Sequence, residues 1–433
     1  MNTPRHDTRL DRFVDSYADR TNGMRVSAVR ALFAVANRPE IVSLAGGMPN
    51  IEDLGLDAIA ENVSRLIRDH GARVMQYGSG QGELPIREAI LDVMALEGIS
   101  AHPDDIVITA GSQQGLDLVT RVFCNPGDVI LAESPSYVGA IGTFLSYQTE
   151  VVHVPSDEHG IDPVALRETI RRLKGQGKRV KFLYTIPNFN NPSGLTQPPE
   201  RRREVLAACN QGGVMVVEDN PYGLLTLEGD PQPAMRADDA DVIYLGSFSK
   251  IFAPGFRVGW VLAPHAVREK LVLAQESATL CPPVFSQFAI ADYLERYDWR
   301  GQIVTYRDMY RERRDAMLEE LSERMPDGVT WTRPTGGFFV WLTMPDGLDS
   351  QAMLPRGVNA RVAYVPGNAF YADGAGSNNL RLSYCFPPAD RIREGVRRLA
   401  SVIRSELEVQ EIFGTATRRP SRIGGPRVNP DLA

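Results

Sequence analysis

The chain has 433 residues and a formal net charge of −7, and 43% of its residues are hydrophobic and 23% charged. This length exceeds what one hydrophobic core supports, so we expect about two or three structural units. The composition is typical of a soluble globular protein and excludes fibrous and disordered classes. Because the acidic charge is spread without long runs of one sign, the sequence argues against a nucleic-acid partner.

Hydropathy and cysteine usage predict a cytoplasmic protein without a membrane anchor or a metal site. No stretch approaches the roughly 18 apolar residues that a membrane span needs, and the polar N-terminus lacks the apolar core of an export signal. The cysteines lie far apart without paired-thiol spacing, which is typical of free thiols in a reducing compartment. They are Cys124, Cys209, Cys281 and Cys385.

Short runs rich in Val, Ile and Leu alternate with helical patterns between about residues 105 and 262. This alternation predicts an α/β fold with a mostly parallel seven-stranded sheet and helices on both faces. The expected strands are 106–109, 129–133, 151–154, 180–185, 214–218, 242–245 and 258–262. Polar residues at the carboxyl ends of such strands are candidates for a ligand site.

The pattern changes after a helix expected over 302–325. Amphipathic strands at 329–333, 337–343 and 380–386 and a final helix near 390–407 predict a smaller α+β domain. We therefore expect four parts in the chain, the last of them a mobile tail. These are an N-terminal segment that packs on the small domain or a dimer interface (1–55), a large α/β domain (56–305), the small domain (306–408) and the tail (409–433).

The first candidate site segment, 110–115, lies between an expected strand and a helix and contains Ser112 and Gln113. Free backbone amides at a helix N-terminus favour a phosphate group, although a simple N-cap at Ser112 explains the segment as well. Tyr137 follows the next strand and is placed to stack on a flat ring, with a core tyrosine as the default interpretation. Asn191 precedes Pro192, which favours an extended backbone from which its amide can reach a ligand oxygen, or else an ordinary loop.

Asp219 follows a strand that should be central and buried, and a carboxylate there needs a cationic partner. A protonated pyridine nitrogen is such a partner, and pyridoxal phosphate uses it to act as an electron sink. Tyr222, three residues later, can reach the phenolic oxygen of the same ring. The segment 219–222 is also typical of a turn, but a turn alone does not account for the buried acid.

Lys250 stands after the strand 242–245 beside Ser247 and Ser249, and Arg257 lies seven residues further on. This position suits a covalent amine, and Lys250 and Arg257 can flank one phosphate-bearing ligand. Most lysines are solvated surface residues, so the interpretation depends on the neighbouring segments.

Arg381 lies inside the apolar strand expected over 380–386. A buried arginine commonly pairs with a carboxylate, which is either that of a substrate or that of one of the many acids in the chain. Both alternatives remain open from the sequence.

These segments resemble the fold type I, pyridoxal-phosphate-dependent aminotransferases of class I/II, and within them the group of 2-aminoadipate and kynurenine aminotransferases. The resemblance covers roughly residues 20–408. Its markers are Ser43-Leu44-Ala45-Gly46-Gly47-Met48-Pro49, Gln76-Tyr77-Gly78, Gly82-Glu83-Leu84-Pro85-Ile86-Arg87-Glu88, Asn191-Pro192-Ser193-Gly194, Asp219-Asn220-Pro221-Tyr222, Ser247-Phe248-Ser249-Lys250, Arg257-Val258-Gly259-Trp260 and Arg381-Leu382-Ser383.

The resemblance implies that Lys250 carries pyridoxal 5'-phosphate as a Schiff base and that Asp219 pairs with its pyridine nitrogen. Asn191 and Tyr222 would hold the phenolic oxygen. Arg381, helped by the backbone near Gly47, would bind the substrate α-carboxylate. The residues implied to bind the phosphate are Ser112, Gln113, Ser247, Ser249 and Arg257, with Tyr77 from the neighbouring subunit. A site shared in this way implies a homodimer.

The implied reaction is a ping-pong transfer of an α-amino group from an L-amino acid to a 2-oxo acid, with 2-oxoglutarate expected from the family. Lys250 would serve as general base. In the resembling group an N-terminal helical arginine meets acidic substrate side chains, and Arg30 matches that position. Arg25 is a competitor, and a solvent-facing arginine is an equally good interpretation. Aromatic, branched aliphatic and acidic amino acids all remain open.

Two other functions remain as alternatives. A β-lyase or a decarboxylase can use the same fold and cofactor. A regulator that fuses a DNA-binding head to such a domain is disfavoured, because the aminotransferase-like pattern begins by about residue 24 and a head needs about 60 residues.

Overall fold

The computed structural model describes residues 13–24 and 38–414. Its central sheet has the strand order β2-β10-β9-β8-β7-β3-β4, in which β10 runs antiparallel to both neighbours and the other pairs are parallel. The strands are β2 (Ile106–Thr109), β3 (Val129–Glu133), β4 (Glu150–Val154), β7 (Val180–Thr185), β8 (Met215–Asp219), β9 (Ile243–Ser247) and β10 (Gly259–Leu262). The predicted mostly parallel seven-stranded sheet is confirmed, with strand ends shifted by one or two residues. Asp219 and Ser247 are consequently the last residues of their strands instead of following them.

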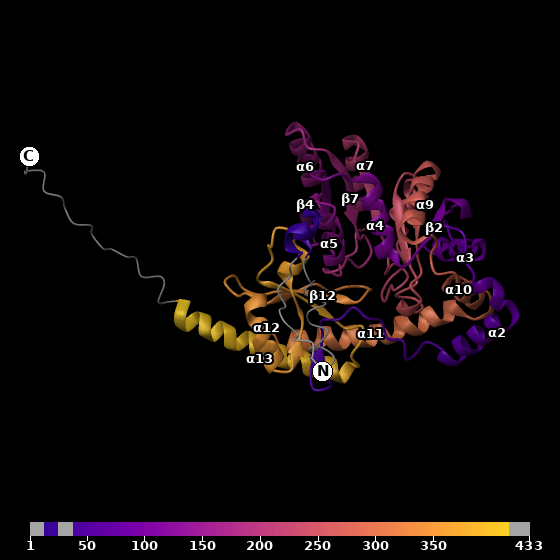
Figure 1. Ribbon diagram of the computed structural model, residues 1–433. Coiled ribbons are helices and arrows are strands. Elements are labelled where there is room, and N and C mark those ends of the chain that lie inside the picture. The colour runs from indigo at the N-terminus through magenta and orange to yellow at the C-terminus, as the bar shows by residue number, and fades with distance from the viewer. Residues whose placement is uncertain (1–12, 25–37, 415–433) are drawn as a thin grey trace, which may run out of the picture.

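Helices cover both faces of this sheet (Figure 1). In β3, Val129 and Leu131 pack with the core beneath α6 and α7, whereas Ile130 packs with the core shared by α4 and α5. This alternation is why nearly continuous apolar runs form strands buried on both sides. The helices of this part are α2 (Leu56–Val74), α3 (Leu84–Ala95), α4 (Ser112–Phe123), α5 (Val138–Ser146), α6 (Pro163–Gly175), α7 (Pro199–Gly212), α8 (Met235–Asp238), α9 (His265–Thr279) and α10 (Val284–Arg296).

The long helix α11 (Trp299–Arg324) runs from beside α10 toward α13 and joins the two main parts of the fold (Figure 1). Beyond it, a second sheet has the order β11-β12-β15-β14, and β1 from the N-terminal segment pairs in parallel with β13. The remaining elements are β1 (Val42–Ser43), β11 (Thr330–Trp331), β12 (Phe339–Thr343), α12 (Ser350–Asn359), β13 (Val362–Ala363), β14 (Val365–Pro366), β15 (Asn379–Ser383) and α13 (Ala389–Gly414). Short elements are β5 (Ser156–Asp157), β6 (Gly160–Ile161), η1 (Val14–Ser16), η2 (Asp19–Gly23), η3 (Pro103–Asp105), η4 (Pro254–Phe256) and η5 (Gly367–Phe370).

The last helix corrects one expected boundary. α13 continues to Gly414, past the predicted end at Leu407, so the first residues of the predicted mobile tail are helical. Residues 408–413 contain no glycine or proline to end the helix, and Gln410 Nε2 donates to the carbonyl of Asp346 at 2.9 Å. Residues 415–433 lie outside the described part of the chain.

Within residues 13–24 and 38–414, none of the helices has the length and hydropathy required to cross a bilayer. The same ranges contain no group of three or more His, Cys, Asp or Glu side chains placed to hold a metal ion. All four cysteines are free thiols.

Candidate active site

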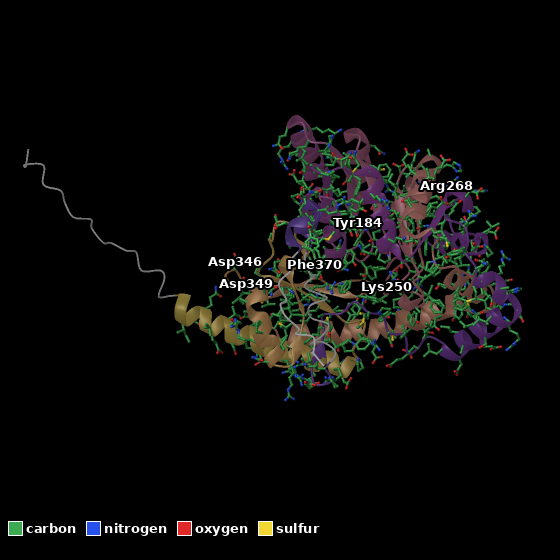
Figure 2. All side chains as sticks on the ribbon, in the orientation of Figure 1. Tyr184, Lys250, Arg268, Asp346, Asp349 and Phe370 are labelled. Atoms are coloured by element: carbon green, nitrogen blue, oxygen red, sulfur yellow. The ribbon has the colours of Figure 1, made fainter. Side chains whose placement is uncertain are left out.

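A cavity of about 490 Å³ opens between the carboxyl ends of the central strands and the β12 and β15 strands of the second sheet. Figure 2 labels Lys250 near this junction. The predicted site residues that line the cavity are Gly47, Ser112, Gln113, Tyr137, Asn191, Asp219, Tyr222, Ser247, Ser249, Lys250, Arg257 and Arg381. The fold therefore gathers residues from both sheets and from their loops, from Gly47 to Arg381, around one space.

The structure does not place the remaining three candidate residues in this wall or does not describe them. Tyr77 is 77% exposed and does not line the cavity of its own chain. Arg25 and Arg30 lie outside the described residues. The sequence analysis assigned no role to several apolar residues that line the cavity. They are Met48 and Ile186 from loops, Leu116 from α4, Val138 from α5 and Phe339 from β12.

Lys250 presents its amine to the cavity, where Nζ donates to the carbonyl oxygen of Gly47 at 2.9 Å. Burial lowers the pKa of this amine to about 8, and the cations Arg381 and Arg257 act in the same direction. A lysine in such surroundings is neutral more often than a surface lysine. It is thus available as a nucleophile or a base close to neutral pH.

Asp219 combines deep burial with an unused oxygen. Its Oδ2 accepts a hydrogen bond from the Tyr184 hydroxyl at 2.7 Å, while the buried Oδ1 has no hydrogen-bond partner in the described part of the chain. Burial raises the pKa of Asp219 to about 6, against the opposing effects of Tyr184 and Lys250. An unpartnered buried carboxylate oxygen is rare unless a ligand completes it, and a protonated ring nitrogen suits this one.

Tyr184 was missed by the sequence analysis. It lies in β7 and pairs with Val217 of β8, so its side chain points to the same face of the sheet as Val217 and Asp219. The register of two strands that are far apart in sequence brings the pair together. The run of β7 gives no signal for it, because tyrosine is common in buried strands.

The N-terminus of α4 and Arg257 form a cationic corner of the cavity. Gly111, with φ of 82°, is the N-cap of α4, so the alternative of an N-cap at Ser112 is wrong and Ser112 is the first helical residue. Arg257 Nη2 donates to the carbonyl of Ala110 at 2.9 Å, and a Cβ on Gly111 would lie 2.4 Å from that nitrogen. Free amides, a helix dipole and a guanidinium together suit a phosphate group.

Further hydroxyl and amide groups line the cavity together with this cationic corner. Ser249 and Ser247 are linked through their hydroxyl oxygens, 2.9 Å apart, and Tyr137 Oη donates to Gln113 Oε1 at 3.4 Å. All four line the cavity. They offer the cavity further hydrogen-bonding groups and, in Tyr137, an aromatic ring.

Arg381 enters the cavity from β15 and is only 2% exposed. Nη1 donates to Asn191 Oδ1 at 2.8 Å and Nη2 to the carbonyl of Ala45 at 2.6 Å, while Nε has no partner among the residues that the structure describes. The guanidinium carbon lies 4.1 Å from the centre of the Phe339 ring. Burial lowers the pKa of Arg381 to about 10, so the group stays cationic at neutral pH. The alternative of a structural ion pair is not seen among residues 38–414, and the charge is free to meet an anionic ligand.

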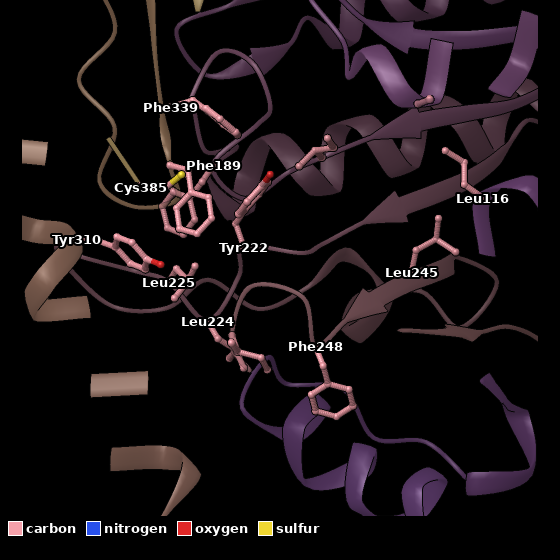
Figure 3. Packing of buried hydrophobic residues seen from close by; sticks show 14 of the residues in the cluster. Leu116, Phe189, Tyr222, Leu224, Leu225, Leu245, Phe248, Tyr310, Phe339 and Cys385 are labelled. Atoms are coloured by element: carbon pink, nitrogen blue, oxygen red, sulfur yellow. The ribbon is translucent and has the colours of Figure 1, made fainter. Parts of the chain in front are cut away.

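Tyr222 also lines the cavity, and Figure 3 shows it beside Phe189 and Phe339. Its ring meets that of Phe339 edge to face, with centroids 5.9 Å apart, and burial raises the pKa of its hydroxyl. The hydroxyl is therefore a neutral donor. With Asn191 Oδ1 engaged by Arg381, the Nδ2 of Asn191 is left as a second donor on this side of the cavity.

Residues 40–399 match the family described as aminotransferase class I and II. The chain belongs to this family. Aromatic-amino-acid aminotransferase 1 of Thermococcus litoralis is 43% identical over 396 residues, which cover 90% of this chain and 95% of the relative. The chain is thus a pyridoxal-phosphate-dependent aminotransferase whose substrates are amino acids and oxo acids, as the resemblance implied.

Two solved structures support the fold and the cofactor. A Pyrococcus horikoshii kynurenine aminotransferase in complex with PMP is 41% identical with a TM-score of 0.86, over 90% of this chain and 97% of that one. An α-aminoadipate aminotransferase from Thermus thermophilus, complexed with N-(5'-phosphopyridoxyl)-L-leucine, is 35% identical with a TM-score of 0.85, over 91% and 99%. The unpartnered Asp219 Oδ1, the Lys250 amine and the cationic corner fit such a phosphopyridoxyl group.

Proposed function

We propose that this aminotransferase moves the α-amino group of an L-amino acid to a 2-oxo acid, with 2-oxoglutarate as acceptor, in a ping-pong reaction. The observation that carries the proposal is the meeting of Lys250, Asp219 and Arg381 in one cavity. The amine of Lys250 matches the aldehyde of the cofactor, and the Asp219 carboxylate, whose Oδ1 has no partner among the described residues, matches its ring nitrogen. The Arg381 guanidinium matches the carboxylate of an amino acid.

In this proposal the residues that line the cavity would hold the cofactor. Lys250 would bind it covalently, Asp219 Oδ1 would meet its ring nitrogen, and Tyr137 would cover the ring. Tyr222 and Asn191 Nδ2 would donate to its phenolic oxygen. The residues that would bind the phosphate are Ser112, Gln113, Ser247, Ser249 and Arg257. Bound pyridoxal phosphate supplies an electron sink for the pair that remains when the α-proton leaves.

The residues of the chain then act on the substrate. Arg381 binds the α-carboxylate through its guanidinium, and its fixed contacts with Asn191 and Ala45 orient it before the substrate arrives. The substrate amine would displace Lys250 from the cofactor, and the freed Nζ would then take the α-proton, which its lowered pKa permits near neutral pH. The backbone carbonyl of Gly47 accepts a hydrogen bond from the same nitrogen and keeps it facing the cavity.

For the amino donor we propose an aromatic or 2-aminoadipate-like amino acid, since the similar proteins are named for aromatic amino acids, kynurenine and α-aminoadipate. Met48 and Val138 give the cavity an apolar wall for such a side chain. Arg30 remains our candidate for contact with an acidic side chain. Replacing Arg30 with Gln should lower kcat/KM for 2-aminoadipate more than for phenylalanine if it makes that contact.

We also propose a homodimer in which Tyr77 completes the partner's phosphate site. Tyr77 and other large apolar side chains are exposed along residues 75–84 and in the turn between α9 and α10. These side chains are Met75, Tyr77, Leu84 and Leu280. Residues 75–84 lie against these helices, because Gln275 of α9 donates to the Gly80 carbonyl and Gln287 of α10 accepts from the Glu83 amide. A cytoplasmic location is proposed from the free thiols.

The absorbance of the purified holoenzyme, mixed with single L-amino acids and no oxo acid, tests this function. A donor should convert the bound cofactor to pyridoxamine phosphate and release one equivalent of 2-oxo acid per site. Release of carbon dioxide or of a β-substituent would instead indicate a decarboxylase or a β-lyase. Cofactor binding without any conversion, together with retention of DNA in a gel shift, would indicate a regulator.

A further inference from the structure

Tyr184 and Asp219 form a buried pair just behind the cavity. The Tyr184 side chain is fully buried and does not line the cavity, whereas Asp219 does. The hydroxyl hydrogen is donated to Oδ2 at 2.7 Å, and Oδ1 remains without a partner. One oxygen of the carboxylate is therefore fixed from behind and the other is left for a ligand.

Among the described residues, Asp219 has no second hydrogen-bond donor to its carboxylate. Tyr184 from β7 and Lys250 after β9 act on the pKa of Asp219. Asp219 in turn raises the pKa of three further tyrosines, which are Tyr137 before α5, Tyr222 after β8 and Tyr244 from β9. Only Tyr184 forms a hydrogen bond with it, and Lys250 is the only cation among them. The rotation of the carboxylate about its Cβ–Cγ bond thus depends on one hydroxyl.

We propose that Tyr184 is a positioning residue for the cofactor, whose hydroxyl holds the Asp219 carboxylate with Oδ1 directed at the ring nitrogen. This inference rests on the role of Asp219 in the proposed function. A hydrogen bond to a charged group is worth about 1.5–3 kcal/mol. Its removal should therefore weaken the contact with the ring nitrogen by about 10- to 100-fold.

The pair also determines how cofactor binding depends on pH. A hydrogen bond donated to a carboxylate favours its ionised form and lowers its pKa, so loss of the hydroxyl raises the pKa of Asp219 further above its usual range. Asp219 then becomes neutral at a higher pH and no longer balances a protonated ring nitrogen. The affinity for the cofactor falls on the acidic side of its pH profile, and this acidic limb should move to higher pH.

Tyr184→Phe is the test variant, because it removes the hydroxyl and keeps the edge-to-face contact of the ring with Phe144. Tyr364→Phe is the matched control: Tyr364 is equally buried, donates one hydrogen bond to the Ser350 carbonyl at 2.8 Å, and does not line the cavity. The probe is pyridoxamine phosphate titrated into cofactor-free protein, since it keeps the ring nitrogen and forms no covalent bond with Lys250.

We expect Tyr184→Phe to bind pyridoxamine phosphate about 10- to 100-fold more weakly, with its acidic limb at higher pH, and Tyr364→Phe to bind as the wild type does. In an Asp219→Ala background, Tyr184→Phe should add less than about threefold, because its effect passes through the missing carboxylate. The inference about Tyr184 would be overturned, and the proposed site left standing, if Tyr184→Phe bound pyridoxamine phosphate with wild-type affinity and wild-type pH dependence while Asp219→Ala bound it weakly. Unchanged binding in Asp219→Ala would overturn the proposed site.

Discussion

Replacing Arg381 with Lys separates recognition of the substrate from binding of the cofactor. Arg381 uses two nitrogens to hold itself against Asn191 and Ala45, and its charge has no acidic partner among the described residues. Lysine keeps the charge but cannot make the same contacts while presenting a planar donor pair to a carboxylate. Loss of one member of a buried charge pair costs roughly 2–5 kcal/mol. We therefore expect kcat/KM for amino acids to fall by about 30-fold to several thousand-fold.

The assay compares an L-amino acid with the amine of the same side chain, which lacks the carboxylate. In the wild type, kcat/KM should be higher for the amino acid than for the amine by about the factor by which Arg381→Lys lowers kcat/KM for the amino acid. The Arg381→Lys protein should lose most of this difference. Its affinity for pyridoxal phosphate should change little. Arg314→Lys is the matched control, since Arg314 is equally buried but pairs with Glu228 and Asp315 outside the cavity.

Two results would refute this reasoning. Arg381→Lys could keep the wild-type kcat/KM for amino acids, which would remove the guanidinium from substrate recognition. It could instead lose activity equally toward the amino acid and the amine, which would make its role structural.

Three further predictions concern the cofactor site and the buried acids. Arg257→Ala should weaken binding of pyridoxamine phosphate by more than about tenfold and leave binding of pyridoxamine unchanged, because only the phosphate meets the guanidinium. Fluorescence titration measures both affinities, and an equal loss of affinity for the two ligands would contradict a phosphate contact. Gly111→Ala should weaken the same phosphate contact, since its Cβ would lie 2.4 Å from Arg257 Nη2 at a φ of 82°; unchanged affinity for pyridoxamine phosphate would contradict it. Burial raises the pKa of Glu97 to about 8 and of Glu133 to about 7, so the folded state binds more protons than the unfolded chain at neutral pH. The stability that these groups contribute is present below their unfolded pKa and is lost as the pH rises through 7–8. The Tm of the cofactor-free protein should therefore fall from pH 5 to pH 9, and it should fall less in Glu133→Gln. An equal fall of Tm with pH in the wild type and in Glu133→Gln would contradict this account.

The large sheet could be predicted from sequence because its strands are buried on both faces and read as unbroken apolar runs. The site followed from the same fact, since Asp219, Lys250 and Asn191 stand where those runs end and parallel strands share that edge. Strand pairs of two residues, such as β1 with β13, have no periodicity to detect and were not predicted.

Other features depend on strand register and burial, which the sequence does not contain. The contact of Tyr184 with Asp219 exists because β7 and β8 pair in a particular register. Glu97 and Glu133 resemble ordinary surface acids in sequence, yet both are buried within hydrogen-bond networks with groups from distant segments. The contact of Tyr77 with a second subunit stays a prediction.

The central claim is that Lys250 carries the cofactor, and the most direct measurement is to reduce the holoenzyme with borohydride and map the modified peptide by mass spectrometry. The account predicts a phosphopyridoxyl group on Lys250 and no modified lysine in the Lys250→Ala protein, which should also lack transaminase activity. A phosphopyridoxyl group on another lysine of the wild type, or transaminase turnover by Lys250→Ala, would contradict it.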